Sequence, residues 1–216
     1  MKVYFISGLA ADSRIFKNIR LPNEFEIVHL DWVPPLEKET LRHYALRLAE
    51  KIDTREKFVL VGLSMGGMIA VEIANHLSVQ STIIISSVPL SNHLPFYFRF
   101  GARLYIHKFL PIGLLKNAAL AKRLFTTETK EDKAILKQII RESDPVFIKW
   151  ALRAILKWDN QKIPDNLVHI HGSRDEILLM RYTKPTHVIA KAGHLMVVNR
   201  SEEINEILKA ILTVDR

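Results

Sequence analysis

A serine flanked by glycines is the feature of this sequence with the clearest chemical meaning. Ser64 lies in the segment VLVGLSMGGM, where an apolar run typical of a buried strand passes directly into a helix-forming stretch. Gly-x-Ser-x-Gly at such a junction predicts a nucleophile elbow, a tight turn that exposes the serine hydroxyl above a sheet. Gly62 and Gly66 fit this turn because side chains there would collide with the neighbouring strand and helix. A glycine-rich turn that binds nothing is the alternative.

A serine needs two partners before it can act as a nucleophile. A base must accept the hydroxyl proton, and a third group must orient that base. At nucleophile elbows the partners follow in the order Ser, acid, His, each at the end of a later strand. Asp175 follows an apolar run in the segment HGSRDE, and His194 follows another in KAGHLM. We therefore predict a triad of Ser64, His194 and Asp175, with Glu176 as the alternative orienting carboxylate.

Acyl chemistry at this serine would also need donors for the developing oxyanion. Two backbone amides normally supply them, one of which belongs to the residue after the nucleophile. Met65 holds that position, and the loop after the first predicted strand should supply the other amide, from Leu9 or alternatively Ala10. The positive end of the helix that begins at the elbow would point at the same anion.

Alternating strand and helix patterns predict the scaffold that positions these residues. Apolar runs indicate six strands, at residues 3–7, 26–30, 58–63, 82–86, 167–171 and 187–190. Helical patterns occur between and after them, at 13–19 (a helix or turn), 40–52, 64–77 and 201–212. We expect an α/β fold with a doubly wound, mostly parallel six-stranded sheet, whose active site lies outside the carboxyl ends of the strands.

A helical insertion interrupts this alternation. Four helices are expected in it, at residues 94–108, 112–125, 130–142 and 145–158. Thr129 begins a capping-box pattern, and Asp144-Pro145 is typical of a helix start. Because strands resume afterwards, we predict a core of residues 1–89 and 164–216 with residues 90–163 as a helical cap.

The formal net charge of +8 is concentrated in this insertion. Residues 90–163 hold 14 Lys and Arg against six Asp and Glu, whereas the rest of the chain holds 17 of each sign. Three interpretations stay open: solvated helix faces, attraction of an anionic substrate or carrier, and loose binding to acidic lipid. Arg99 and Arg103 are the first candidates for anchors of a substrate carboxylate or phosphate. No nucleic-acid-binding motif accompanies the charge, so no specific nucleic-acid partner is expected.

Composition excludes several other classes of protein. The chain has no cysteine, so disulfides, thiolate metal sites and a cysteine nucleophile are ruled out. His169 and His171 alternate on one face of a predicted strand at a spacing compatible with a metal, but no third ligand is evident, and we expect neither metal nor cofactor. No apolar run is long enough to span a bilayer, and the N-terminal run fits a first strand better than a signal peptide. We expect a soluble, cytoplasmic protein.

Together these motifs make the sequence similar to the α/β-hydrolases, of the compact kind with a helical cap. The resemblance covers the whole chain: the first loop, the GLSMGG elbow, the HGSRD acid loop and the AGH segment near the C-terminus. Three departures stand out. Ser7-Gly8 replaces the His-Gly of many relatives, only 18 residues separate Asp175 from His194, and the antiparallel hairpin that opens the family fold is missing.

The resemblance implies a serine hydrolase that cleaves a carboxylic ester or thioester of a small acyl substrate. Some small capped relatives, including the menaquinone-pathway cyclohexadiene synthase, instead use the triad as a base, with cap arginines gripping carboxylates, so a lyase or carbon–carbon bond hydrolase is the alternative. A binding module on a hydrolase scaffold is a third possibility. Haloalkane dehalogenases and epoxide hydrolases are disfavoured because they need a carboxylate where Ser64 stands. Acyl length, leaving group and oligomeric state stay open.

Overall fold

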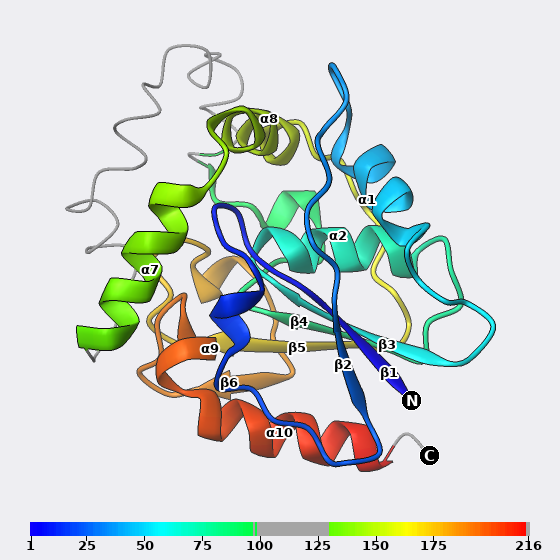
Figure 1. The fold of residues 1–216 in the computed structure, drawn as a ribbon, viewed down its shortest axis with the longest axis vertical. Helices are drawn as coiled ribbons and strands as arrows, with labels where there is room; N and C mark the ends of the chain where they lie inside the picture. Colours follow the sequence, from blue (N-terminus) through cyan, green and yellow to red (C-terminus); the bar gives the residue numbers. More distant parts are fainter. Residues whose placement is uncertain (97, 99–129, 215–216) are drawn as a thin grey trace.

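The computed structural model describes residues 1–96, 98 and 130–214, which form one sheet with helices on both faces (Figure 1). Six parallel strands stand in the order β2-β1-β3-β4-β5-β6. They are β1 Lys2–Ile6, β2 Glu26–His29, β3 Phe58–Leu63, β4 Ser81–Ile85, β5 Leu167–Gly172 and β6 His187–Ile189. The predicted fold class is confirmed, and the ends of each strand lie within one residue of the predicted range.

The central strands of the sheet are buried. Every residue of β3 and β4 is buried, as expected for parallel strands covered on both faces. Along β1 the side chains alternate between two apolar cores, with Tyr4 and Ile6 in one and Val3 and Phe5 in the other. β3 lies between β1 and β4, so its carboxyl end opens near the middle of the sheet edge.

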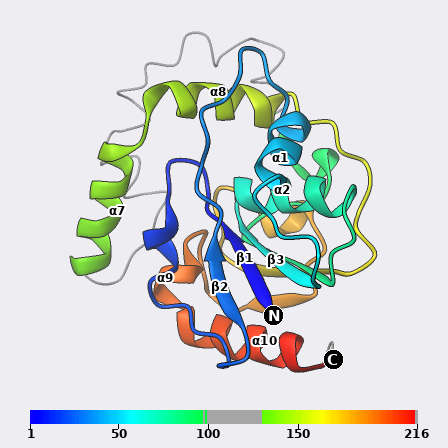
Figure 2. The ribbon, with the colours of Figure 1, turned by 45° about the vertical axis from the view of Figure 1, so that its right-hand side comes forward.

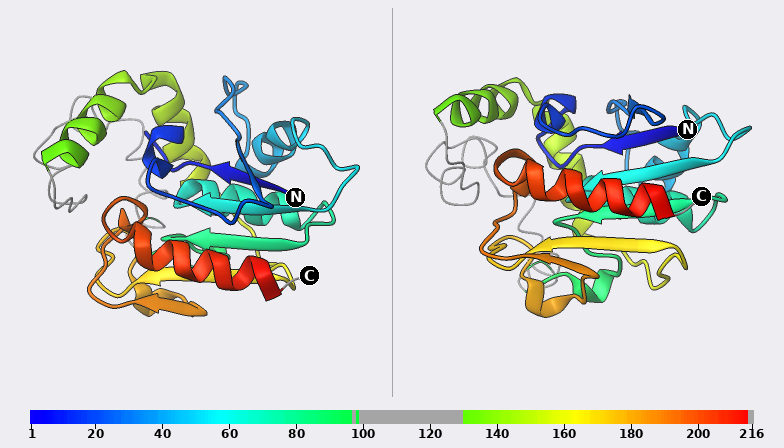
Figure 3. Two further views of the ribbon diagram at one scale, coloured as in Figure 1. Left: turned by 60° about the horizontal axis from the view of Figure 1, so that its bottom comes forward. Right: turned by 90° about the horizontal axis from the view of Figure 1, so that it is seen from below.

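Helices cover the two faces of the sheet (Figure 2, Figure 3). One face carries α1 (Leu41–Ala49) and α2 (Met65–Ala74), and the other carries the 3₁₀ segment η1 (Ser13–Phe16), α9 (Met196–Asn199) and α10 (Ser201–Val214). α1 and α2 are shorter than predicted because their last turns tighten to i,i+3 hydrogen bonds, such as Ile52 N to Ala49 O and His76 N to Ile73 O.

Two helices of the insertion, α7 (Lys130–Glu142) and α8 (Pro145–Leu156), lie beyond the carboxyl ends of the strands (Figure 1). Asp144 caps α8 as predicted, because its side chain accepts from Val146 N. Two indoles then tie α8 and the residues after it to the core: Trp150 Nε1 donates to Glu39 O at 3.0 Å, and Trp158 Nε1 donates to Glu72 Oε1 at 2.6 Å.

Several predictions fall outside the described residues. They are the helices at 94–108 (beyond its first residues) and 112–125, the capping box that begins at Thr129, and the cap arginines Arg99 and Arg103. The division into a core and a cap at residues 90–163 stays a prediction. Among the described helices, none is both long enough and apolar enough to cross a bilayer.

The short connections carry little secondary structure. The 18 residues between Asp175 and His194 are too few for a full helix between the last two strands, and the segment between β5 and β6 holds only the 3₁₀ turn η3 (Met180–Tyr182). A similar turn, η2 (Ser91–His93), follows β4. The segment 13–19, predicted as a helix or turn, forms only η1, whose N-cap is Asp12. Strand ends and loops therefore lie close together at the carboxyl edge of the sheet.

Candidate active site

Ser64 lies at the sharp turn between β3 and α2. Its backbone has φ 53° and ψ −118°, a conformation that L-residues rarely adopt. Hydrogen bonds hold this strained turn from both sides: Ser64 N donates to Ile85 O at 2.9 Å, and Ser87 Oγ donates to Ser64 O at 2.6 Å. The geometry is that of the predicted elbow, in which the turn leaves the serine side chain outside the sheet.

The glycines beside Ser64 permit contacts that no side chain would allow. A Cβ at Gly62 would lie 2.3 Å from Gly66 O, and a Cβ at Gly66 would lie 2.2 Å from Ile6 O and 2.3 Å from Ser7 O. The start of α2 therefore packs directly on the backbone of β3 and on the end of β1. This close packing explains why the sequence places glycine at both positions.

A Gly66→Ala variant is expected to lose about 3 kcal/mol or more of unfolding free energy, because the new methyl group meets backbone atoms of β1 that cannot move aside. Urea titration followed by circular dichroism measures the loss. Gly8→Ala is the matched control, since its Cβ would lie 3.3 Å from Ser64 Cβ and 3.5 Å from the nearest backbone atom. Equal losses in the two variants would contradict the proposed packing.

The structure brings the three predicted triad residues together. His194 Nε2 lies 2.9 Å from Ser64 Oγ, and His194 Nδ1 lies 2.8 Å from Asp175 Oδ2. Asp175 comes from the loop after β5, and His194 from the loop after β6. The imidazole can thus accept the serine proton on one nitrogen while the carboxylate holds the other.

The Asp175 carboxylate is buried, with 2% of its surface exposed. Its Oδ1 accepts hydrogen bonds from the amides of Ile177 and Leu178, both at 2.9 Å. Burial opposes the charged form, but the charge of His194 and the hydrogen bonds from His171 and His194 outweigh it and hold the pKa of Asp175 well below its usual value. The carboxylate is therefore ionised throughout the neutral range.

The loop after β1 (residues 7–12), termed the β1 loop, carries the predicted oxyanion amide of Leu9. The loop is strained at Ala10, where φ is 57°, and Ala11 N closes a turn by donating to Gly8 O at 3.1 Å. The Leu9 amide has no hydrogen-bond acceptor among the described residues. Met65 is the first residue of α2, so its amide has no acceptor within the helix. Both predicted amides are therefore available to a substrate oxygen.

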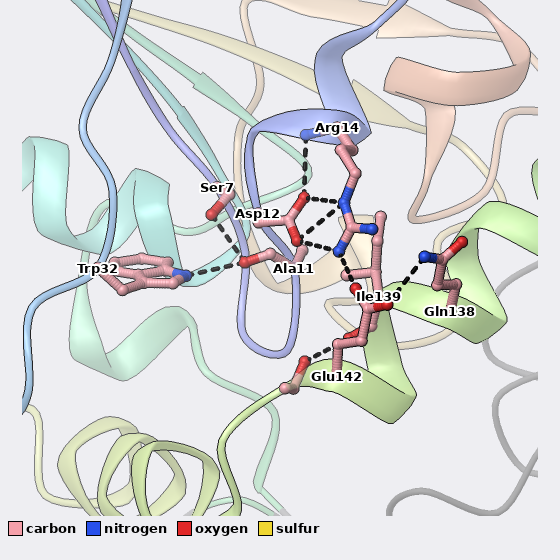
Figure 4. Close-up of polar contacts among 9 residues, drawn as sticks. Ser7, Ala11, Asp12, Arg14, Trp32, Gln138, Ile139 and Glu142 are labelled. Atoms are coloured by element: carbon pink, nitrogen blue, oxygen red, sulfur yellow. Dashed lines mark hydrogen bonds and ion pairs between the residues drawn. The ribbon is translucent and has the colours of Figure 1, made fainter.

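Two side chains fix the β1 loop at the Ala11 carbonyl (Figure 4). Ser7 Oγ donates to Ala11 O at 3.0 Å, and Trp32 Nε1 donates to the same oxygen at 2.8 Å from the segment after β2. Ser7 stands where many relatives have histidine, and its small hydroxyl turns back onto its own loop. No sequence pattern indicated this pairing, since Ser7 and Trp32 lie far apart along the chain.

Removal of both donors is expected to loosen the β1 loop. Ser7→Ala with Trp32→Phe should lower kcat of the turnover proposed below by about tenfold, the value of one or two neutral hydrogen bonds. KM should change as well, because Trp32 also lines the neighbouring pocket. Steady-state kinetics on an ester substrate measure both constants. Tyr44→Phe is the matched control, because its hydroxyl binds the backbone of Val33 and not the β1 loop. An unchanged kcat in the double variant would contradict this role.

An ion-pair bridge joins the same loop to α7 (Figure 4). Arg14 Nη2 lies 2.6 Å from Asp12 Oδ2 and 2.7 Å from Glu142 Oε2. The three side chains are partly exposed, so the bridge contributes little stability. Its position matters more, because it places the C-terminal end of α7 beside the loop that carries Leu9.

A pocket of about 250 Å³ opens between this loop and the insertion helices. It is lined by residues of the β1 loop, of the segment after β2 and of the α7–α8 corner: Ala10, Ala11, Asp12, Trp32, Val33, Pro34, Ile139, Glu142, Ser143, Asp144 and Phe147. The walls are largely apolar, with carboxylates at Asp12, Glu142 and Asp144. The pocket begins one residue beyond Leu9.

The structure also shows the contacts of the two histidines whose spacing is compatible with a metal. His169 and His171 bind each other, with His169 Nε2 2.9 Å from His171 Nδ1, and His171 Nε2 lies 2.7 Å from Leu178 O. These ring nitrogens are occupied, and no group of three ligating side chains suited to a metal occurs among the described residues. Glu176, the alternative carboxylate, is exposed and takes no part in the contact with His194.

Comparison with known proteins identifies the family of this fold. Residues 3–207 match the model of the alpha/beta hydrolase family, so the chain belongs to that family. No curated protein sequence matches it.

Solved structures with similar folds come from several hydrolase-fold proteins. MenH from S. aureus has a TM-score of 0.77 and 19% identity, covering 100% of this chain and 94% of that one. A thermophilic esterase from Thermogutta terrifontis has a TM-score of 0.73 and 18% identity, covering 100% and 90%. The enol-lactonase from Burkholderia xenovorans has a TM-score of 0.72 and 16% identity, covering 98% and 91%. At these identities the likeness establishes the fold.

Proposed function

We propose that this protein is a serine hydrolase that cleaves a carboxylic ester or thioester through an acyl-enzyme. The observation that carries the proposal is the pair of short contacts from His194, 2.9 Å to Ser64 Oγ and 2.8 Å to Asp175 Oδ2. A purely structural hydrogen-bond network does not need a hydroxyl on a strained turn at the end of a buried strand. A nucleophile does, because this turn exposes the hydroxyl to a substrate.

In this mechanism Ser64 Oγ attacks the substrate carbonyl while its proton moves to His194 Nε2. The amides of Leu9 and Met65 stabilise the oxyanion of the tetrahedral intermediate. As the intermediate collapses, the leaving alkoxide or thiolate takes the proton from His194, and the acyl group stays on Ser64. A water molecule then gives its proton to His194 and attacks the acyl carbon, which releases the acid and restores the Ser64 hydroxyl. Asp175 remains ionised throughout.

The pocket beside the β1 loop is lined by none of the proposed triad residues, and we infer that it takes a substrate group that extends from the reacting carbonyl past this loop. Its volume of about 250 Å³ lies below the usual range for whole drug-sized ligands. A small, mostly apolar acyl or alcohol group fits this space better than a long chain. Asp12, Glu142 and Asp144 line the pocket, and Arg14 pairs with the first two. Among these described side chains one cation offsets three carboxylates, so we expect neutral groups to be preferred over anionic groups at this position.

The test is covalent labelling combined with a substrate panel. A fluorophosphonate probe should label Ser64 in the folded protein, and peptide mass spectrometry should locate the adduct. p-Nitrophenyl esters and acyl thioesters of increasing chain length should be hydrolysed, with short acyl groups turned over fastest. Failure of the probe to label Ser64 would exclude a serine hydrolase and favour a binding module.

The alternative of a lyase or carbon–carbon bond hydrolase predicts a different result in the same panel. Ser64 would still react with the probe, but the generic esters and thioesters would be hardly turned over. That chemistry would depend on basic side chains that grip carboxylates, and the candidates Arg99 and Arg103 lie outside the described residues.

A further inference from the structure

Two buried histidines stand behind Asp175, and the proposed triad does not use them. His169 and His171 occupy the same face of β5 and are 1% and 0% exposed. Their ring centroids lie 5.0 Å apart at an interplanar angle of 79°. Buried imidazoles are unfavourable unless every ring nitrogen has a hydrogen-bond partner, so the identity of those partners indicates what the pair does.

His171 reaches the carboxylate directly. Its Nε2 lies 2.7 Å from Leu178 O and 3.3 Å from Asp175 Oδ2. A carbonyl oxygen can only accept a hydrogen bond, so the Nε2 of His171 carries a proton, and this proton also faces the carboxylate. Since Oδ1 accepts two backbone amides and Oδ2 faces both His194 and His171, all four acceptor sites of Asp175 are filled.

The proton on His171 Nε2 sets the direction of the hydrogen bonds behind it. With this proton on Nε2 and none on Nδ1, His171 accepts at Nδ1, and His169 donates from Nε2 across the 2.9 Å contact. His169 Nδ1 lies 3.5 Å from Thr183 Oγ1, and that hydroxyl lies 3.3 Å from His93 Nδ1 in η2. The chain of contacts thus runs from a half-buried histidine at the start of the insertion to the carboxylate.

His169 stays neutral in this arrangement. Burial, together with the neighbouring His171, lowers the pKa of His169 to about 3. The pKa of His93 is also below its usual value, because of burial and Lys184. The backbone of Ser87 offers the His169 ring a second acceptor. The tautomer with the proton on the nitrogen that faces His171 is the one that presents Nε2–H of His171 to Asp175.

We propose that His171 is a positioning residue for the acid of the triad, and that His169 fixes its tautomer. The Nε2–H of His171 holds Asp175 Oδ2 in the plane where it meets His194 Nδ1 and shares the negative charge on that oxygen. This inference rests on the proposed serine-hydrolase function, because only there does the orientation of His194 matter.

A merely structural role for His171 is the competing explanation. Through Leu178 O the same nitrogen ties β5 to the acid loop, so its removal would weaken that loop whatever the chemistry. The two roles differ in the expected pH dependence. Without the His171 donor, Asp175 attracts the protonated form of His194 more strongly. The titratable and charged groups that face His171 among the described residues are His169, Asp175 and His194, with His93 and Lys184 further along the chain.

The experiment compares His171→Leu with His171→Gln, whose side-chain amide can still donate near the Nε2 position. The rate constant for fluorophosphonate labelling of Ser64, measured against pH, is the main readout because it needs no natural substrate. We expect His171→Leu to be labelled about 10- to 100-fold more slowly. Its acidic limb should move up by about half to one pH unit. His171→Gln should recover most of the rate and return the limb toward its original position.

Different outcomes separate this inference from the function on which it rests. If the wild-type protein is not labelled, the proposed function fails. If the wild type is labelled and His171→Leu shows the same rate and pH profile per folded molecule, His171 is structural and the inference is overturned. Should His171→Leu fail to fold, His169→Leu takes its place: a smaller rate loss with the same upward movement of the acidic limb supports the inference, and an unmoved limb overturns it.

Discussion

Ser64→Ala is expected to fold normally and to lose about 100,000-fold or more in kcat on any ester or thioester that the wild-type protein hydrolyses. The substitution removes the only oxygen that His194 Nε2 contacts in the described structure, at 2.9 Å, so no acyl-enzyme can form. The amides of Leu9 and Met65, proposed to bind the substrate oxygen, belong to the backbone and stay in place. The variant should therefore retain only a slow background hydrolysis by water, with KM near its original value.

The fold should tolerate this change because the elbow is held by backbone groups. Ser64 N donates to Ile85 O, and Ser64 O accepts from Ser87 Oγ, and neither contact needs the Ser64 side chain. Steady-state kinetics and thermal unfolding together measure the effect. Ser87→Ala is the matched control: it removes a hydroxyl from the same elbow but leaves the nucleophile, so kcat should fall by about tenfold at most. Undiminished turnover by Ser64→Ala would remove the basis of the proposed mechanism.

The arrangement of the three proposed triad residues was predictable because each belongs to a local sequence pattern. The apolar run of β3 followed at once by glycines is a strand-to-helix turn. Asp175 and His194 each follow a short apolar run, and the carboxyl ends of parallel strands share one edge of a sheet. Alternation of strands and helices is enough to place all three at that edge, although it sets no distance between their atoms.

Contacts that depend on tertiary packing were not predictable. The convergence of Ser7 and Trp32 on one carbonyl joins segments that no sequence pattern links. The contact between His171 and Asp175 was equally unpredictable, because the alternating spacing of His169 and His171 indicated only that the two could share a metal. The two histidines contact each other, and His171 alone contacts the carboxylate of Asp175. Such contacts need the curvature of the loop after β5, which apolar periodicity does not encode.

Asp175→Asn should reduce kcat by about 10,000-fold while leaving the fold intact. Because Oδ1 accepts from the amides of Ile177 and Leu178, the asparagine will place its carbonyl oxygen there and its NH₂ group at the Oδ2 position. That group can only donate, so it forces the Nδ1 of His194 to accept. The imidazole proton then sits on Nε2, which faces Ser64 and can no longer take the hydroxyl proton.

The variant should still fold because His171, on the other side of Asp175, keeps one of its two hydrogen-bond acceptors. With NH₂ in place of Oδ2, His171 Nε2–H loses its contact with the carboxylate but keeps Leu178 O at 2.7 Å. Kinetics, together with ¹⁵N NMR of the His194 ring to identify the protonated nitrogen, test the argument. The matched control is Glu176→Gln, an exposed carboxylate one residue away, which should retain full activity. A proton still found on His194 Nδ1 in Asp175→Asn would show that the carboxylate does not set the tautomer.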